Sequence, residues 1–238
     1  MTTIAATRTP TFTPIPKRTG GTRIITHLAT REAARYARLV ARVTRQVDGA
    51  LARGVATDRL ACGGRALESS RGARRRFRAA LTDLRGADIV LARVDVRDCF
   101  PSITPVTVER CLVDLGCHPT EVLPVRRFLE ELGDLGVRGV PVGPQVSGIL
   151  ANAVLQQVDR SLEREHVPFA RWVDDVFVAA ADERSATDIV ERIAETLSAI
   201  GLRLNRDKTG IGPGHAADRL AGILVSPSGE AGSRGSAS

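Results

Sequence analysis

The chain has 238 residues, 43% of them hydrophobic, and carries a formal net charge of +7 with a sequence pI of about 10.2. This length suits one or two globular domains, and the apolar fraction suffices for a buried core. No run approaches the roughly 20 apolar residues of a membrane span, and the N-terminus has no secretory signal, so we expect a cytoplasmic protein without a membrane partner. The basic charge favours polyanions such as nucleic acid.

The two ends of the chain differ in composition from its middle. Residues 1–14 are rich in Thr and Pro, which predicts a disordered N-terminus, and residues 226–238 predict a flexible tail. Apolar residues at helical spacing predict helices over 30–52, 72–84, 105–115, 120–133, 147–164 and 185–200. Short apolar runs predict strands over 89–95, 169–173, 176–180, 202–204 and 220–225. From residue 89 onward this order is typical of an α+β fold of ferredoxin-like type.

A dense basic run lies at the start of the helix predicted over 72–84. Its members Arg71, Arg74, Arg75 and Arg78 fall on one face at helical spacing. This face is either merely solvated or contacts nucleic-acid phosphates, which would position the nucleic acid without reading its sequence.

Two adjacent aspartates, Asp174 and Asp175, separate the strands predicted over 169–173 and 176–180. Two polar residues between short apolar runs predict a hairpin that presents both carboxylates at its tip. Asp is also a common turn residue, so the pair alone is compatible with a simple turn. Asp95 ends the strand predicted over 89–95, and in an antiparallel sheet that strand end can lie beside the hairpin tip. Together the three carboxylates suit a hard cation such as Mg²⁺.

A series of segments resembles, in order and spacing, the reverse transcriptases, which copy RNA or DNA into DNA. The resemblance runs from about residue 15 to residue 225, over segments 16–24, 95–103, 139–152, 171–175, 201–209 and 220–225. The Pro-Val-Gly-Pro form at 141–144 looks most like the bacterial abortive-infection and defence-associated enzymes. Two residues depart from common family patterns: Trp172 replaces the usual Tyr, and Val142 replaces the Gln of retroviral and intron enzymes.

The resemblance implies a right-hand polymerase fold, α+β in class. Its fingers would span residues 15–88, and a ferredoxin-like palm would span 89–225, with 105–140 contributing to the fingers. The chain stops after the strand that grips the primer end in the family. The resemblance therefore implies that a helical thumb is absent or is supplied by a partner chain.

The resemblance also assigns roles to individual residues. Asp95, Asp174 and Asp175 become the expected catalytic carboxylates, which bind two Mg²⁺ (or Mn²⁺) ions with help from the carbonyl of Val96. The expected nucleotide contacts are Lys17, Arg23, Phe100, Gly143, Gln145 and Lys208. The expected primer or template contacts are Trp172, Ser147 and Gly222. Taken without their neighbours, Phe100 is an ordinary core aromatic and 139–152 an ordinary loop before a helix.

These implications favour an RNA-directed DNA polymerase that adds dNTPs to a primer 3′-hydroxyl on an RNA template. The alternative is a catalytically weak or inactive nucleic-acid-binding palm that works with a partner protein. A third interpretation, untemplated or self-primed synthesis in phage defence, rests only on the Pro-Val-Gly-Pro segment.

Overall fold

The structure is a computed structural model that describes residues 9–17, 21–61, 64, 66–84 and 89–213. The strand predicted over 220–225 and the tail predicted over 226–238 lie outside the described residues. None of the described helices is both long and apolar enough to cross a membrane.

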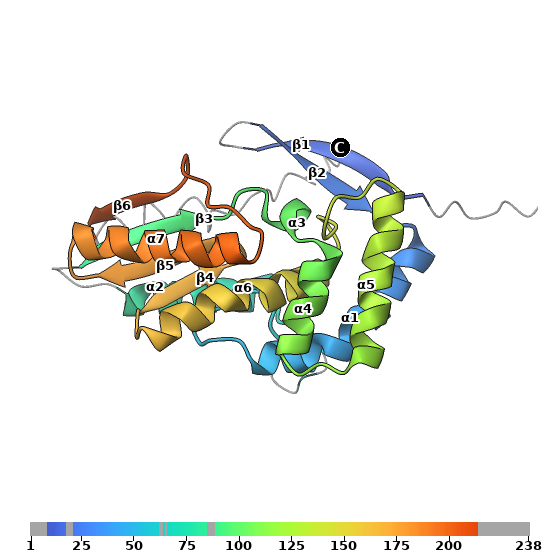
Figure 1. Cartoon of the computed structure of the whole chain (residues 1–238), viewed down its shortest axis with the longest axis horizontal. Helices are drawn as coiled ribbons and strands as arrows, with labels where there is room; N and C mark the ends of the chain where they lie inside the picture. The colour runs from blue at the N-terminus through green and yellow to red at the C-terminus, as the bar shows by residue number, and fades with distance from the viewer. Residues whose placement is uncertain (1–8, 18–20, 62–63, 65, 85–88, 214–238) are drawn as a thin grey trace, which may run out of the picture.

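A four-stranded antiparallel sheet forms the left end of the molecule in Figure 1. Its strands are β3 (Val90–Asp95), β4 (Phe169–Trp172), β5 (Asp175–Ala180) and β6 (Gly210–Pro213), and their spatial order is β4-β5-β3-β6. Helices intervene between β3 and β4 and between β5 and β6. This is the element order of a ferredoxin-like unit, and it confirms the predicted α+β class.

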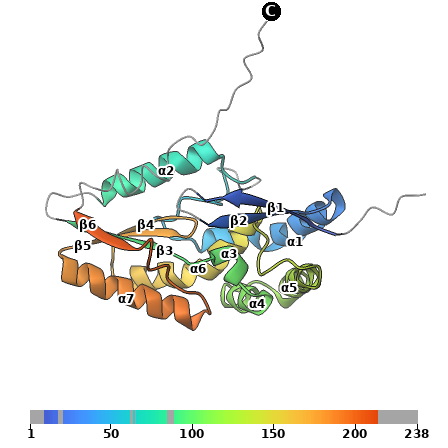
Figure 2. The same cartoon turned by 90° about the horizontal axis from the view of Figure 1, so that it is seen from above.

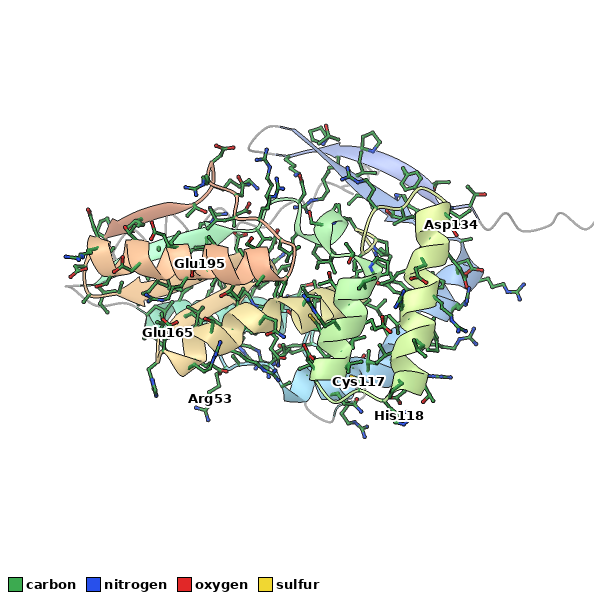
Figure 3. The ribbon with its side chains drawn as sticks, viewed as in Figure 1. Arg53, Cys117, His118, Asp134, Glu165 and Glu195 are labelled. Carbon is green, nitrogen blue, oxygen red and sulfur yellow. The ribbon has the colours of Figure 1, made fainter. Side chains whose placement is uncertain are left out.

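Helices cover both faces of this sheet (Figure 2). On one face lie α6 (Ser147–Arg164) and α7 (Glu183–Ala199), and on the other lies α2 (Ser70–Asp83). Strand side chains alternate between the faces: Val176 and Val178 join the core on the α6 side, whereas Phe177 packs edge-on against Phe77 of α2. Glu165 lies at the end of α6 (Figure 3), where its carboxylate forms an ion pair with Arg192 of α7, with Oε2 2.7 Å from Nε.

The other end of the molecule is helical. It contains α1 (Thr30–Gly49), α4 (Pro105–Asp114) and α5 (Pro119–Asp134), and Figure 3 marks the two ends of α5 by His118 and Asp134. Tyr36 of α1 stacks on Phe128 of α5 with the ring centroids 5.2 Å apart. One continuous apolar cluster runs from these helices through α6 into the sheet. The sheet and the helical end therefore share a core.

Residues 11–14 form part of a strand, which corrects the prediction that residues 1–14 are disordered. Strand β1 (Thr11–Pro16) pairs antiparallel with β2 (Thr22–His27) along its whole length. Every residue of β1 is exposed, so backbone hydrogen bonds to β2, and not core burial, hold it in place. Apolar periodicity cannot reveal such a strand.

Two further departures from the predicted elements lie near one another. The strand predicted over 202–204 is reduced to a single bridge between Leu204 and Val96. A short helix, α3 (Cys99–Ser102), follows β3 and is too brief to show a helical period in the sequence.

Candidate active site

The three predicted carboxylates converge at one end of the sheet. Asp95 is the last residue of β3 and lies directly opposite Asp175, the first residue of β5. Asp174 occupies the turn that joins β4 to β5. Asp95 and Asp175 are only 5% and 6% exposed. The sequence therefore anticipated the grouping of these side chains, while their catalytic role stays a prediction.

The tip of the hairpin is displaced by one residue from the predicted Asp-Asp turn. Trp172 pairs with Asp175, so Val173 and Asp174 form the turn. Val173 has a φ of +55°, a conformation that β-branched residues rarely adopt. Asp175 is drawn into β5 because it pairs with Asp95 across the sheet.

Two of the carboxylates have cationic partners within the chain. Arg93 of β3 places its Nε 2.8 Å and its Nη2 2.7 Å from Asp175 Oδ1. Lys208 Nζ lies 3.3 Å from Asp95 Oδ2, and Asn205 Nδ2 donates to Asp95 Oδ1 at 2.6 Å. Sequence reasoning missed Arg93 and Asn205. Arg93 could have been found from its place two residues before Asp95, because residues i and i+2 of a strand lie on the same face of the sheet.

Asp174 lies in a strongly perturbed electrostatic environment. Burial, together with the charges of Asp175 and Asp95, raises the pKa of Asp174 to about 7. The guanidinium of Arg23 on β2 opposes this rise in pKa, which places Arg23 within electrostatic reach of Asp174. Burial also raises the pKa of Asp175, while Arg93 acts to lower it. Concentrated negative charge of this kind is what a bound divalent cation would relieve.

The carboxylates meet the requirements of Mg²⁺ only in part. Within the described ranges, no three His, Cys, Asp or Glu side chains form a group arranged to hold a metal. Mg²⁺ usually takes only one or two protein carboxylates and completes its shell with water and substrate phosphates. Asp95 and Asp174 fit that pattern. Val96, whose carbonyl was the other predicted ligand, is buried and bridged to Leu204.

The hairpin of β1 and β2 brings predicted nucleotide contacts toward the carboxylates. Lys17, which follows β1, places its Nζ 3.5 Å from Asp98 Oδ1. The N–H of Thr26 on β2 donates to the carbonyl of Val142 at 2.7 Å, which joins the hairpin to the segment before α6. Gly143 has a φ of +130°, and a Cβ there would lie 3.0 Å from the Thr26 carbonyl oxygen. A glycine is required at this crossing.

Three other predicted contacts lie near the start of α6. Phe100 of α3 is half-buried, and its carbonyl accepts from the N–H of Val140 at 3.0 Å. Gln145 is exposed before α6. Ser147 is 1% exposed, and its hydroxyl lies 3.1 Å from that of Tyr36. Its hydroxyl is thus occupied inside the protein, and the primer or template contact by Ser147 stays a prediction.

The remaining predicted contacts lie around α2, except for Gly222, which is outside the described residues. Trp172 is half-buried, with its ring centroid 5.4 Å from that of Phe77 on α2. The basic face of α2 is exposed at Arg71, Arg75 and Arg78 and half-buried at Arg74. This exposure leaves both the solvated-face and the phosphate-contact interpretations open.

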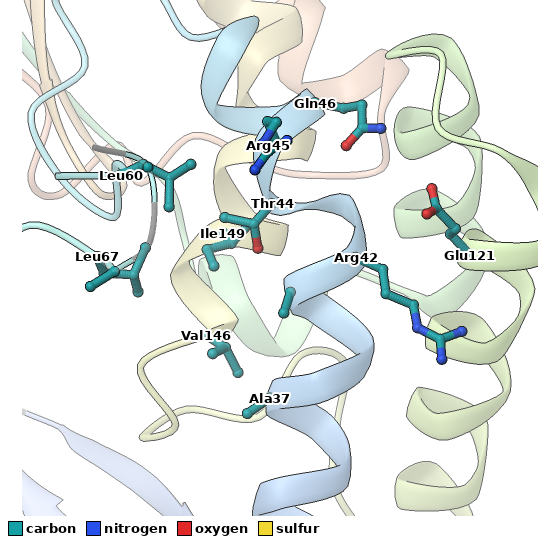
Figure 4. Close-up of a pocket in the computed structure, with 13 residues that line it drawn as sticks. Ala37, Arg42, Thr44, Arg45, Gln46, Leu60, Leu67, Glu121, Val146 and Ile149 are labelled. Atoms are coloured by element: carbon teal, nitrogen blue, oxygen red, sulfur yellow. The ribbon is translucent and has the colours of Figure 1, made fainter. Parts of the chain in front are cut away.

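A separate cavity of 440 Å³ lies between α1, the start of α6 and residues 60, 64, 66 and 67 (Figure 4). Its lining includes Arg42, Thr44, Arg45, Leu67 and Ile149. None of the predicted catalytic or nucleotide-binding residues lines it. The candidate site is therefore the carboxylate end of the sheet and not this cavity.

Comparison with known proteins shows which family the sequence matches. Residues 15–215 match the family described as reverse transcriptase (RNA-dependent DNA polymerase). Retron Mx65 reverse transcriptase of Myxococcus xanthus is 30% identical over 153 residues, which cover 57% of this chain and 36% of that protein. Retron Mx162 reverse transcriptase of the same organism is 25% identical over 173 residues, which cover 61% and 35%. The chain thus spans about a third of the length of these relatives.

Solved structures share the fold at low sequence identity. Apo telomerase from Candida tropicalis matches with a TM-score of 0.57 and 12% identity, over 91% of this chain and 46% of that chain. Telomerase from Candida albicans, in complex with a TWJ fragment of telomeric RNA, matches with a TM-score of 0.56 and 14% identity, over 87% and 42%. Because the family match covers well over half of the sequence, this chain belongs to the reverse transcriptase family and is distantly related to bacterial retron reverse transcriptases.

Proposed function

We propose that this chain is the fingers and palm of an RNA-directed DNA polymerase that adds dNTPs to a primer 3′-hydroxyl on an RNA template. The observation that carries the proposal is the convergence of Asp95, Asp174 and Asp175 at one end of the sheet, in a family defined by this activity. The fingers would comprise residues 15–88 with 105–140, and the palm the rest of 89–225.

Asp95 and Asp174 are the proposed ligands of two Mg²⁺ ions, for which Mn²⁺ can substitute. When bound, the ions would lower the pKa of the primer hydroxyl and neutralise charge on the leaving pyrophosphate. Asp175 supports the site from its ion pair with Arg93, which fixes one of its oxygens. Lys208, whose Nζ lies 3.3 Å from Asp95 Oδ2, is proposed to contact the triphosphate.

Residues around the carboxylates would bind and orient the substrates. Arg23, near Asp174, and Lys17 are proposed to hold the triphosphate, since a guanidinium suits two-point contact with phosphate. Phe100 is proposed to lie under the sugar, with Gly143 and Gln145 near the base. The exposed arginines of α2 are proposed to contact the nucleic-acid backbone.

Primer extension with the purified protein, dNTPs and Mg²⁺ on RNA and DNA templates tests the proposal. Asp174→Asn is expected to lower the rate by roughly 10³-fold, because metal catalysis supplies several kcal/mol of transition-state stabilisation. Asp188→Asn, which changes an exposed aspartate of α7, is the matched control and should keep the wild-type rate. An unchanged rate in Asp174→Asn would remove the carboxylate from the mechanism.

The alternative is a nucleic-acid-binding palm that acts with a partner protein, such as a chain that supplies a thumb. Internal pairing of Asp95 and Asp175 with cations and the exposed arginines of α2 favour it. It predicts salt-dependent RNA binding without incorporation under any metal. A role in phage defence rests on the Pro-Val-Gly-Pro segment and the retron relatives, and sequencing of reaction products would separate templated from untemplated synthesis.

A further inference from the structure

A fully buried ion pair lies behind the turn that carries Asp174. Arg171 of β4 and Asp159 of α6 are both 0% exposed. Arg171 Nε donates to Asp159 Oδ1 at 2.8 Å, and Nη2 donates to Oδ2 at 2.7 Å. This two-point contact fixes the orientation of the guanidinium and leaves Nη1 directed elsewhere.

The remaining nitrogen of Arg171 extends the pair into a network that ends on the turn. Nη1 donates to Asn152 Oδ1 at 2.9 Å and to the carbonyl of Val173 at 2.8 Å. Asn152 Nδ2 donates to the carbonyl of Thr57 at 2.9 Å. Thr57 Oγ1 in turn accepts from the N–H of Val173 at 3.1 Å. Both the N–H and the carbonyl of Val173 are therefore bonded to buried side chains.

Thr57 reaches the turn because its own segment is paired with β4. The N–H of Arg171 donates to the carbonyl of Gly54 at 2.8 Å, and the N–H of Ala56 donates to the carbonyl of Arg171 at 3.0 Å. A Cβ on Gly54 would lie 2.3 Å from the carbonyl oxygen of Phe169. Only glycine allows this approach, so Gly54 determines how closely Thr57 comes to the turn.

Stability alone does not account for this arrangement. A buried ion pair contributes little net stability, because desolvation offsets the attraction between its charges. Val173 at a φ of +55° is in a conformation that costs free energy for a β-branched residue and persists only where its surroundings impose it. The hydrogen bonds to its N–H and carbonyl are contacts that impose it here. The direction of the next residue, Asp174, depends on that conformation.

We propose that Thr57, Asn152, Asp159 and Arg171 are positioning residues, here termed the buried clamp, that fix the Val173 peptide and so set where the Asp174 carboxylate lies relative to Asp95. The inference rests on the proposed function, because Asp174 is there a metal ligand. It adds that metal affinity at the site depends on side chains that never touch the metal or the substrates.

The sharpest test changes one acceptor atom. Thr57→Val removes the hydroxyl and preserves the shape, whereas Thr57→Ser retains the acceptor. Thr44→Val is the matched control, because Thr44 is also buried and its hydroxyl also bonds a main-chain group, the carbonyl of Val40 within α1. Hydrogen exchange of the Val173 amide in the metal-free protein and Mn²⁺ affinity, measured by electron paramagnetic resonance, are the two readouts.

We expect Thr57→Val to exchange the Val173 amide faster and to bind Mn²⁺ roughly 10-fold more weakly, in the range known for partners of metal ligands. Thr57→Ser and Thr44→Val should match the wild type in both readouts. If Thr57→Val exchanges the Val173 amide and binds Mn²⁺ as the wild type does, the proposed clamp is overturned.

A second variant distinguishes loss of the clamp from general unfolding of the protein. The double change Arg171→Met with Asp159→Leu replaces the buried pair by apolar side chains, which often leaves stability intact. It should keep a cooperative unfolding transition and still exchange the Val173 amide faster than the wild type. If the double variant folds and its Val173 amide exchanges as slowly as in the wild type, the proposed clamp is overturned. If Asp174→Asn leaves Mn²⁺ affinity unchanged, the proposed metal site fails, and the exchange readout still decides the clamp.

Discussion

The two hairpins that border the candidate site are held in opposite ways. The β4–β5 turn rests on buried side chains, with Arg171 and Asp159 fully enclosed beneath it. The β1–β2 hairpin is exposed along β1 and is tied to the site by one backbone hydrogen bond from Thr26 and by the ion pair of Lys17 with Asp98. The difference indicates that the side proposed to bind metal is held rigidly, whereas the side proposed to meet the triphosphate can shift at small cost.

The largest effect is expected from Arg93, which holds Asp175 on the rigidly held side. Arg93→Met leaves a buried carboxylate without its partner, so the free energy of unfolding should fall by roughly 3 kcal/mol or more. Urea unfolding measures the loss. The control is Arg126→Met, because Arg126 is solvent-exposed and its pairs with Glu109 and Glu130 are screened by water and contribute little. Equal losses in the two variants would contradict the contrast between buried and exposed support.

The second-largest effect is expected from Asp174→Asn, which should raise the stability of the protein at high pH but not at low pH. The pKa of Asp174 is raised from its ordinary value of 3.8 to about 7, so folding disfavours the ionised form. Stability of the metal-free protein should therefore fall as pH rises from about 4 to about 7 and stay level above that range. Asp174→Asn should reduce this decline and be more stable than the wild type at pH 8 by on the order of 3 kcal/mol.

Urea unfolding at pH 4 and pH 8 in the absence of metal measures this difference, which should vanish at the lower pH. Mg²⁺ at pH 8 should narrow it, because a ligand that binds the folded wild type stabilises it by mass action. Asp188→Asn should show no comparable change. A stability gain in Asp174→Asn that is the same at both pH values would contradict the assigned perturbation.

The smallest effect on stability is expected at the exposed hairpin. The side chains of Lys17 and Asp98 are 29% and 60% exposed, so their pair contributes less than about 1 kcal/mol. If Lys17 contacts the triphosphate, Lys17→Met should raise the KM for dNTP several-fold without changing the unfolding midpoint. Asp98→Asn frees Lys17 and should leave the KM equal or lower. Steady-state primer extension separates these outcomes, and a KM raised equally by both changes would assign the pair a structural role.

The parts of the fold that follow from local pattern were predictable. Leu150, Val154 and Val158 repeat every four residues and are buried along α6 as that period requires. The grouping of Asp95 with Asp174 followed from motif order and the antiparallel sheet. What the pattern could not give is long-range polar pairing: Thr57 bonds Val173 across 116 positions of the chain. The one-residue shift of the turn has the same origin, since pairing with Asp95 draws Asp175 into β5.

The segment around Gly54 also covers one border of the sheet. A strand at the border of a sheet exposes unpaired N–H and carbonyl groups, which can recruit another chain and lead to aggregation. Residues 54–56 lie parallel to β4 and bond its backbone at Arg171, so this border is already covered. Among the described strands of this sheet, β6 is the other border. Any strand that widens the sheet, from this chain or from a partner, must therefore add beside β6.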